Sequence, residues 1–89
     1  MKGVYEGDFV NGLKEGKGYY RGINGVKYKG DYKNGVKEGF GEIYNNDDTL
    51  SYKGEFKNGL SHGRGTAYSK FGEVETEWVE GVEKGVLDQ

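Results

Sequence analysis

The chain of 89 residues contains no cysteine, no proline and a single histidine. Without cysteine it can form neither a disulfide framework nor a thiolate metal site, and one histidine cannot make a Cys/His metal cluster. Small secreted domains often depend on disulfides. We therefore expect a protein of a reducing, cytoplasmic compartment that holds no metal and no cofactor.

Apolar residues and charge of one sign are also scarce. Hydrophobic residues make up 33% of the chain, below the roughly 45–50% of a typical globular domain. No apolar run approaches the ~18 residues of a membrane span, and residues 1–10 lack the apolar segment of a signal peptide. Because the chain has 13 basic and 15 acidic residues, its charges nearly balance, and nonspecific attraction to nucleic acid or to an anionic membrane is not expected.

What the chain does have is glycine, 18 residues, and aromatic side chains, 15% of the total. Disordered chains are usually poor in aromatics, so we expect one small folded domain over residues 1–89. Sixteen of the 18 glycines fall on one repeating frame. Such phasing excludes a flexible glycine-rich linker.

Three full repeats and one degenerate repeat make up this frame. They read "YEGDFVNGLKEGKGYYRGINGVK" over 5–27, "YKGDYKNGVKEGFGEIYNNDDTLS" over 28–51 and "YKGEFKNGLSHGRGTAYSKFGE" over 52–73, with periods of 23, 24 and 22. In the fourth, residues 74–89, Trp78 takes the aromatic position and Thr76 replaces the first glycine.

The pattern Tyr-x-Gly-x-Phe-x-Asn-Gly-x-x-x-Gly-x-Gly resembles the MORN repeat. The chain departs from it at Tyr32, which replaces Phe, at Thr76, and at "NNDD" over 45–48, where a turn glycine is expected. The resemblance implies a scaffolding role through protein–protein contact. It also implies a link to membrane phospholipids, which the family has been associated with.

Each repeat is predicted to form one β-hairpin, because residues alternate before Asn-Gly at 11–12, 34–35 and 58–59. The glycine spacing suggests a long loop, "NGLKEG", that reverses the chain between Val10 and Gly16. A second turn near Gly25 or Gly72 leads to the next unit. The predicted fold is all-β, a single-layer twisted antiparallel sheet of about six to eight strands, with a turn of helix or a frayed end over 82–89.

Residues two apart in a strand share a face, so Tyr28, Gly30 and Tyr32 should point the same way. A glycine between two aromatic residues leaves bare backbone, on which we expect a ring from the next hairpin to lie. Gly7, Gly30 and Gly54 are the predicted structural glycines of the three full units.

The aromatic face is the candidate partner-binding groove, with Ile43 and Ala67 expected to join it from return strands. Its predicted residues are Tyr5, Phe9, Tyr20, Tyr28, Tyr32, Tyr52, Phe56 and Trp78. One interpretation is that these rings are only the core. The other is that they bind a partner, because a single sheet has no second layer to cover an open aromatic face.

The opposite face is predicted to be solvated and to carry cross-strand charge pairs. Its charged residues are Glu6, Asp8, Lys29, Asp31, Lys33, Lys53, Glu55 and Lys57. His62 falls at the position of Glu15 and Glu38 in what the repeat predicts to be a loop, which suggests a solvated side chain rather than a catalytic base. No Lys-Ser/Thr follows the Gly-x-Gly pairs at 16–18, 39–41 and 63–65, so phosphate-loop chemistry is not expected.

The sequence therefore predicts a non-enzymatic scaffold that binds an amphipathic helix or extended peptide, or a second copy of itself as a homodimer through unpaired strand edges. Binding to phospholipid is the alternative. The expected location is cytoplasmic, and a membrane or cytoskeletal periphery is compatible with both functions.

Overall fold

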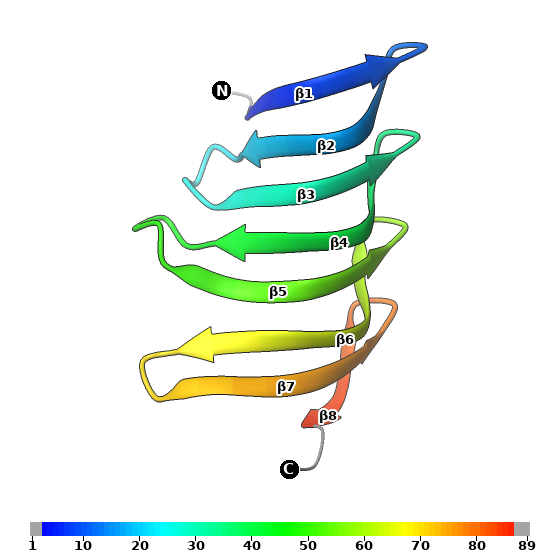
Figure 1. Ribbon diagram of the computed structural model, residues 1–89. Coiled ribbons are helices and arrows are strands. Elements are labelled where there is room, and N and C mark those ends of the chain that lie inside the picture. The colour runs from blue at the N-terminus through cyan, green and yellow to red at the C-terminus, as the bar shows by residue number, and fades with distance from the viewer. Residues whose placement is uncertain (1–2, 87–89) are drawn as a thin grey trace.

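The computed structural model describes residues 3–86, in which every regular element is a β-strand (Figure 1). The eight strands are β1 Val4–Val10, β2 Leu13–Arg21, β3 Lys27–Lys33, β4 Val36–Tyr44, β5 Leu50–Lys57, β6 Leu60–Ser69, β7 Gly72–Val79 and β8 Val82–Val86. Each strand pairs antiparallel with the next, in the order β1 to β8, in one open sheet. The predicted all-β sheet of successive hairpins is confirmed. No helix long and apolar enough to cross a membrane occurs among these residues.

Each repeat forms one hairpin, and the degenerate fourth unit forms β7 and β8. All the Asn-Gly or Glu-Gly tips lie along one side of the sheet, and the connections between units lie along the other side (Figure 1). The part of the 82–89 segment that the structure describes is strand β8, Val82–Val86, and not a turn of helix. Residues 87–89 lie outside the described range.

The hairpin tips are two-residue turns, so the predicted long loop between Val10 and Gly16 is wrong. Val10 pairs directly with Leu13, and Asn11 and Gly12 have φ of 52° and 80°. Positive φ at both central residues is the type I′ geometry that matches the twist of a hairpin. Gly16 belongs to β2, close to a break in the register of the β1–β2 pairing, which shifts between Gly7 and Asp8. The third glycine of the motif therefore serves a β-bulge.

Consecutive hairpin tips are tied to one another by backbone hydrogen bonds. The Gly35 N–H donates to the Lys14 carbonyl at 2.9 Å, and the Gly59 N–H donates to the Lys37 carbonyl at 2.9 Å. These bonds fix how one unit stacks on the next at the tip side of the sheet.

His62 takes part in the same tip-to-tip contacts, so its prediction as a solvated loop residue is wrong. It lies in β6, and its Nδ1 accepts a hydrogen bond from the Glu80 N–H at 3.2 Å. Glu15 accepts in the same way from the Asn34 N–H, at 3.2 Å. His62 thus replaces a glutamate as a hydrogen-bond acceptor, which is a structural role.

The acidic segment that replaces a turn glycine forms the same turn as its glycine-containing counterpart. In the first connection Gly25 has φ of 88°, and in the second Asp48 has φ of 71°. The Asn45 N–H closes the second turn on the Thr49 carbonyl at 2.8 Å. Aspartate tolerates this left-handed conformation better than most residues, so the repeat keeps its geometry without the glycine.

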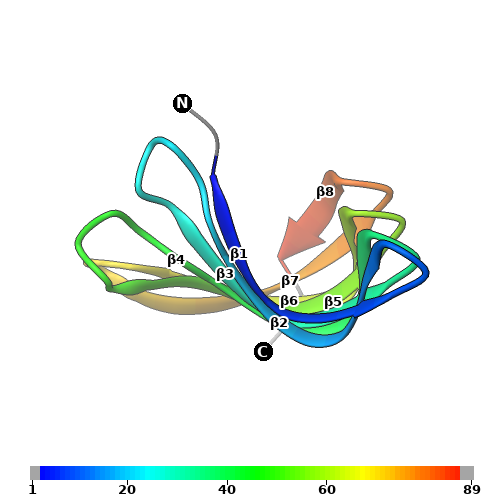
Figure 2. The ribbon, with the colours of Figure 1, turned by 90° about the horizontal axis from the view of Figure 1, so that it is seen from above.

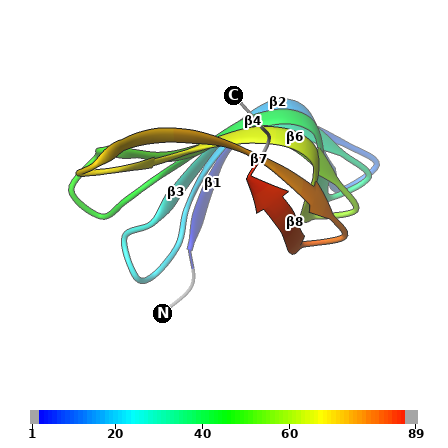
Figure 3. The ribbon, with the colours of Figure 1, turned by 90° about the horizontal axis from the view of Figure 1, so that it is seen from below.

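Each strand curves along its length, so the sheet forms a trough whose axis runs across the strands, seen end-on in Figures 2 and 3. The four apolar residues with the least exposed surface are Tyr28 at 2%, Tyr32 and Tyr52 at 6%, and Phe56 at 5%. All four belong to the predicted aromatic face. We conclude that this face is the inner side of the bend, because side chains on an inner surface converge and bury one another.

The glycines between the aromatic residues leave bare backbone on which a tyrosine ring lies, and we call this position the seat. The ring comes from the same strand as that glycine and not from the next hairpin. A Cβ built on Gly30 would collide with the β4 backbone at the Gly41 Cα and the Phe40 carbonyl and would lie 2.8 Å from the Tyr28 hydroxyl oxygen, and a Cβ on Gly41, opposite Gly30 in β4, would overlap the Tyr28 ring. Tyr5 lies likewise over Gly7 and Gly18. The expectation of a ring from the next hairpin is therefore wrong, because the tyrosine leans along its own strand over both glycines.

The fourth unit fills this seat differently. Thr76, at the glycine position, is 3% exposed, and Val74 stands where the other units have tyrosine. The Trp78 indole N–H donates to the Thr76 hydroxyl oxygen at 2.7 Å, and that hydroxyl donates to the Gly65 carbonyl at 3.4 Å. In the fourth unit, threonine therefore fills the position that is glycine in the other units, and no tyrosine ring covers that position.

Two buried tyrosines that differ in one hydrogen bond give the first prediction. The Tyr28 hydroxyl donates to the Asp31 carbonyl at 2.9 Å, whereas the buried Tyr52 hydroxyl makes no well-aligned hydrogen bond among the described residues and has the Ser61 side chain as a polar neighbour. Tyr28→Phe should lower the free energy of unfolding by about 1 kcal/mol, and Tyr52→Phe should be neutral or stabilising. Urea denaturation measures both, and equal losses in the two variants would contradict the assignment.

Candidate functional site

The aromatic face carries an unbroken row of seven rings. Six edge-to-face contacts join them, with ring centroids 5.1–5.8 Å apart. The order along the row is Phe9, Tyr5, Tyr32, Tyr28, Phe56, Tyr52 and Trp78. Edge-to-face pairs each contribute about 0.5–1.5 kcal/mol beyond the area they bury. The row therefore couples all four units on one face.

The return strands contribute to this face as predicted. Tyr20 pairs with Tyr5 across β1 and β2, and Ile43 pairs with Tyr28 across β3 and β4. Both pack against the buried cluster. Ala67 is opposite Tyr52 in the β5–β6 pairing and so lies on the same face. The structure thus brings all eight predicted groove residues together.

These eight residues differ in how much of their surface is exposed. Tyr28, Tyr32, Tyr52 and Phe56 are nearly covered and form the core. Phe9 is 60% exposed at one end of the row, and Tyr5, Tyr20 and Trp78 are partly exposed. We call this inner face the aromatic groove. Its accessible aromatic surface is concentrated at the two ends.

Two lysines that the sequence analysis did not single out also lie on this face. The Lys14 Nζ lies 5.3 Å from the ring centroids of Tyr5 and Tyr20, and the Lys37 Nζ lies 4.9 Å from that of Tyr28. Such distances are typical of cation–π contacts. The signal in the sequence is the shared pattern Asn-Gly-x-Lys of the first two units, which places a lysine two residues after the glycine of each turn.

Burial of the ring row raises the pKa of its tyrosines. Burial, with smaller contributions from Tyr5 and Tyr20, raises the pKa of Tyr32 to about 12. Burial likewise raises the pKa of Tyr28 and that of Tyr52. The groove is therefore lined by neutral phenols over the physiological pH range.

The opposite face carries a cross-strand charge pair, as predicted. The Lys17 Nζ lies 2.6 Å from a carboxylate oxygen of Asp31, and the other oxygen accepts a hydrogen bond from the Phe40 N–H at 3.2 Å. The hydrogen bond from Lys17, followed by that from Phe40, lowers the pKa of Asp31. Through its hydrogen bond with the Phe40 N–H, Asp31 stabilises the β-bulge at Gly39, where φ is 96°.

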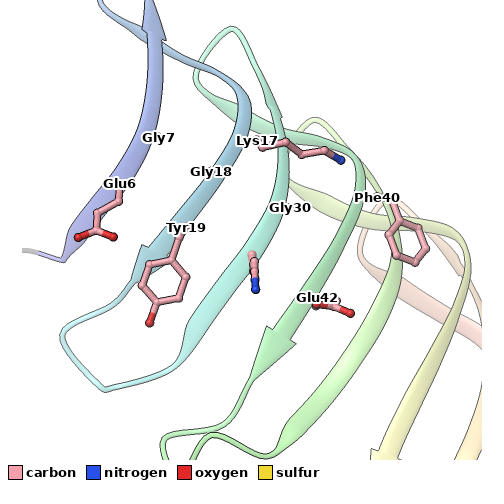
Figure 4. A pocket seen from close by; sticks show the side chains of 9 residues that line it. Glu6, Gly7, Lys17, Gly18, Tyr19, Gly30, Phe40 and Glu42 are labelled. Carbon is pink, nitrogen blue, oxygen red and sulfur yellow. The ribbon is translucent and has the colours of Figure 1, made fainter.

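A shallow depression of about 640 Å³ interrupts this second face (Figure 4). Its floor is the glycine backbone of β1, β2 and β3, and its rim includes Tyr19 and the 51%-exposed Phe40. The residues predicted for this face are all charged. The sequence does indicate both rings. Tyr19 is adjacent to Tyr20 and Phe40 is adjacent to Gly41, and neighbouring residues of a strand point to opposite faces.

Comparison with family models matched the MORN repeat at residues 5–27, 28–49 and 52–70. The chain belongs to the MORN-repeat family. No curated protein sequence matched the chain. The three matches coincide with the first three hairpins, whereas the fourth hairpin, β7–β8, lies beyond them.

Each position of the MORN motif has a structural role in this chain. Its tyrosine covers the seat, its first glycine forms the seat, its Asn-Gly forms the turn and its next glycine serves the bulge. MORN repeats are generally non-enzymatic modules, found in proteins that bind other proteins or associate with membranes. Among residues 3–86, no group of three His, Cys, Asp or Glu side chains could hold a metal ion.

The buried MORN tyrosines predict how stability depends on pH. The unfolded chain loses the Tyr32 proton near pH 10.0, whereas the folded chain keeps it to about pH 12. Stability should therefore be full below pH 10 and fall as the pH rises from 10 towards 12. Circular dichroism and tyrosinate absorbance, followed together, should show strand loss in that range.

The matched variant is Tyr32→Phe, because Phe9 and Phe56 occupy the same position in other units. It keeps the ring and removes one ionisable group, so its alkaline unfolding midpoint should move to higher pH. An unchanged midpoint would show that Tyr32 ionisation does not oppose folding.

Proposed function

We propose that this chain is a non-enzymatic protein-binding module, and that the aromatic groove receives an amphipathic helix, an extended peptide or a second copy of the chain. The observation that carries the proposal is the exposure of Phe9. This ring ends the row with 60% of its surface accessible, while the equivalent Tyr32 and Phe56 are covered by tyrosines of the preceding units.

The position of Phe9 explains why a partner would add binding energy there. Inside the sheet, each ring of this kind contacts the tyrosine of the preceding unit, as Tyr32 contacts Tyr5 at 5.2 Å. Among residues 3–86, no tyrosine of a preceding unit contacts Phe9 in the way that Tyr5 contacts Tyr32. A partner that supplies an apolar or aromatic side chain at this end would complete the contact that the repeats make internally.

A second copy is a candidate partner because both ends of the sheet are edge strands. Within residues 3–86, β1 pairs only with β2 and β8 pairs only with β7. Each edge carries backbone N–H and C=O groups that can pair with another strand. A helix or peptide in the groove and a strand paired to the β1 edge would both make contact near Phe9.

Phospholipid binding is the weaker alternative. Over residues 3–86 the outer face mixes acidic and basic side chains, as in the pair of Lys17 with Asp31 at 2.6 Å, and it builds no dense basic patch there. Stable electrostatic attachment to a membrane usually takes several clustered basic residues.

Two exposed phenylalanines on opposite faces make a matched test. Phe9→Ala should weaken binding of an apolar-faced helical peptide, or self-association, by about 2 kcal/mol. Phe40→Ala, which removes a similarly exposed ring from the outer face, should change either by less than about 0.5 kcal/mol. The fluorescence of Trp78, the only tryptophan, reports peptide binding in the groove, and light scattering over a concentration series reports self-association.

Both variants must first retain their strand spectrum and cooperative melting. If folded Phe40→Ala loses the partner while Phe9→Ala keeps it, the binding surface is the outer depression and not the groove.

A further inference from the structure

Lys14 and Lys37 occupy the same position in the first two units, one on β2 and one on β4. Lys14 pairs with Phe9, and Lys37 pairs with Tyr32. Both side chains therefore share the face of the aromatic row. Their ammonium groups lie over rings of that row, with the Lys37 Nζ 4.9 Å from the centroid of Tyr28.

Neither ammonium group has a carboxylate partner within residues 3–86. The ion pairs of this part of the chain join Lys17 to Asp31 and Lys27 to Asp48. Burial lowers the pKa of Lys37, and the nearby charge of Lys14 lowers it further. A partly desolvated cation without a counter-ion is unfavourable, so an anion in the groove would be stabilised by both lysines.

The charge in the groove changes along the sheet. The position of Lys14 and Lys37 is occupied by Ser61 in the third unit and by Glu83 in the fourth, where Glu83 pairs with Trp78. The inner face is therefore basic over the first two units, neutral over the third and acidic at the fourth. A partner that lies along the groove should carry its acidic residues over units one and two.

The spacing of the two lysines distinguishes a helix from a strand. They lie two strands apart, which is about 9.6 Å at the usual separation of neighbouring strands. Residues i and i+7 of an α-helix share a face and lie about 10.5 Å apart. Same-face residues of an extended strand lie about 6.6 or 13 Å apart, which fits less well.

An apolar recess lies next to Lys37. It has a volume of about 160 Å³, and its apolar lining is Tyr20, Val26, Tyr28 and Ile43, while Lys37, Lys27 and Asn24 line its margin. A leucine-sized side chain on the same face of the helix could enter it, while an acidic residue meets the lysine. A helix that binds in a groove lays its apolar face into it, with anchor residues spaced at i, i+3, i+4 and i+7.

We propose that the groove binds an acidic amphipathic helix, with two carboxylates seven residues apart that pair with Lys14 and Lys37 and an apolar side chain in the adjacent recess. This inference rests on the proposed function and adds the chemistry of the partner. The proposal predicts that the two lysines in the groove, and not the net charge of the chain, make the protein bind an acidic helix in preference to a neutral one.

The test uses two helical peptides that differ only at positions i and i+7, with Glu at both in one and Gln at both in the other. At low salt the Glu peptide should bind about tenfold more tightly than the Gln peptide. The double variant Lys14→Gln/Lys37→Gln should lose this preference. Lys29→Gln/Lys53→Gln, with the same charge change on the outer face, should keep it within about twofold.

A gain-of-binding variant guards against a loss that reflects unfolding, because Lys37 packs over Tyr28. Ser61→Lys extends the row of lysines to the third unit. A peptide with a third Glu at i+14 should then bind several-fold more tightly to the variant than to the parent. No gain in a folded variant would overturn the proposal.

The remaining outcomes separate this inference from the proposed function. If the Gln peptide binds as tightly as the Glu peptide and Phe9→Ala weakens both, the groove binds helices and the charge inference is wrong. If vesicles of phosphatidylserine and phosphatidylcholine bind through Lys14 and Lys37 and neither peptide does, the ligand is a lipid headgroup and both proposals fail.

Discussion

The structure depends on the packing of a tyrosine ring over two glycines of its own hairpin. A single-layer sheet has no second sheet or helix against which to bury apolar surface. Tyr28 solves this by lying over Gly30 and Gly41, where any side chain would collide with its ring. The ring is then only 2% exposed, and its edge is free to meet Tyr32 and Phe56 at 5.3 Å. The same packing thus forms the core of each unit and the contact to the next.

The surface that is open to a partner lies at the ends and along the margins of the aromatic core. The central rings are covered, so a partner finds its surface at Phe9, at the edge strands and at the lysines beside the row. The degenerate fourth unit shows how the row can stop, because Val74 replaces the tyrosine and Thr76 fills the vacant seat. The groove is consequently asymmetric, basic near the first unit and acidic at Glu83 near the fourth.

Much of the fold could be predicted from the sequence, because strand alternation and glycine phase directly determine which residues share a face. The aromatic row and the hairpin order follow from them. The turn length could not be predicted, since glycine spacing alone does not tell whether Gly16 closes a loop or forms a bulge. The direction of the tyrosine rings depends on side-chain rotamers, and the roles of His62 and Lys14 depend on contacts between units that one repeat does not contain. Whether the groove binds a partner stays a prediction.

The most direct test of the central claim is a double-mutant cycle between the seat and its ring, measured by urea denaturation. Gly41→Ala alone should lower the free energy of unfolding by about 1–3 kcal/mol, because the added methyl group displaces Tyr28. In a Tyr28→Val background, which imitates Val74 of the fourth unit, Gly41→Ala should be neutral or slightly stabilising. An interaction energy of about 1 kcal/mol or more between the two sites would support the account. An equal cost of Gly41→Ala in both backgrounds would contradict it.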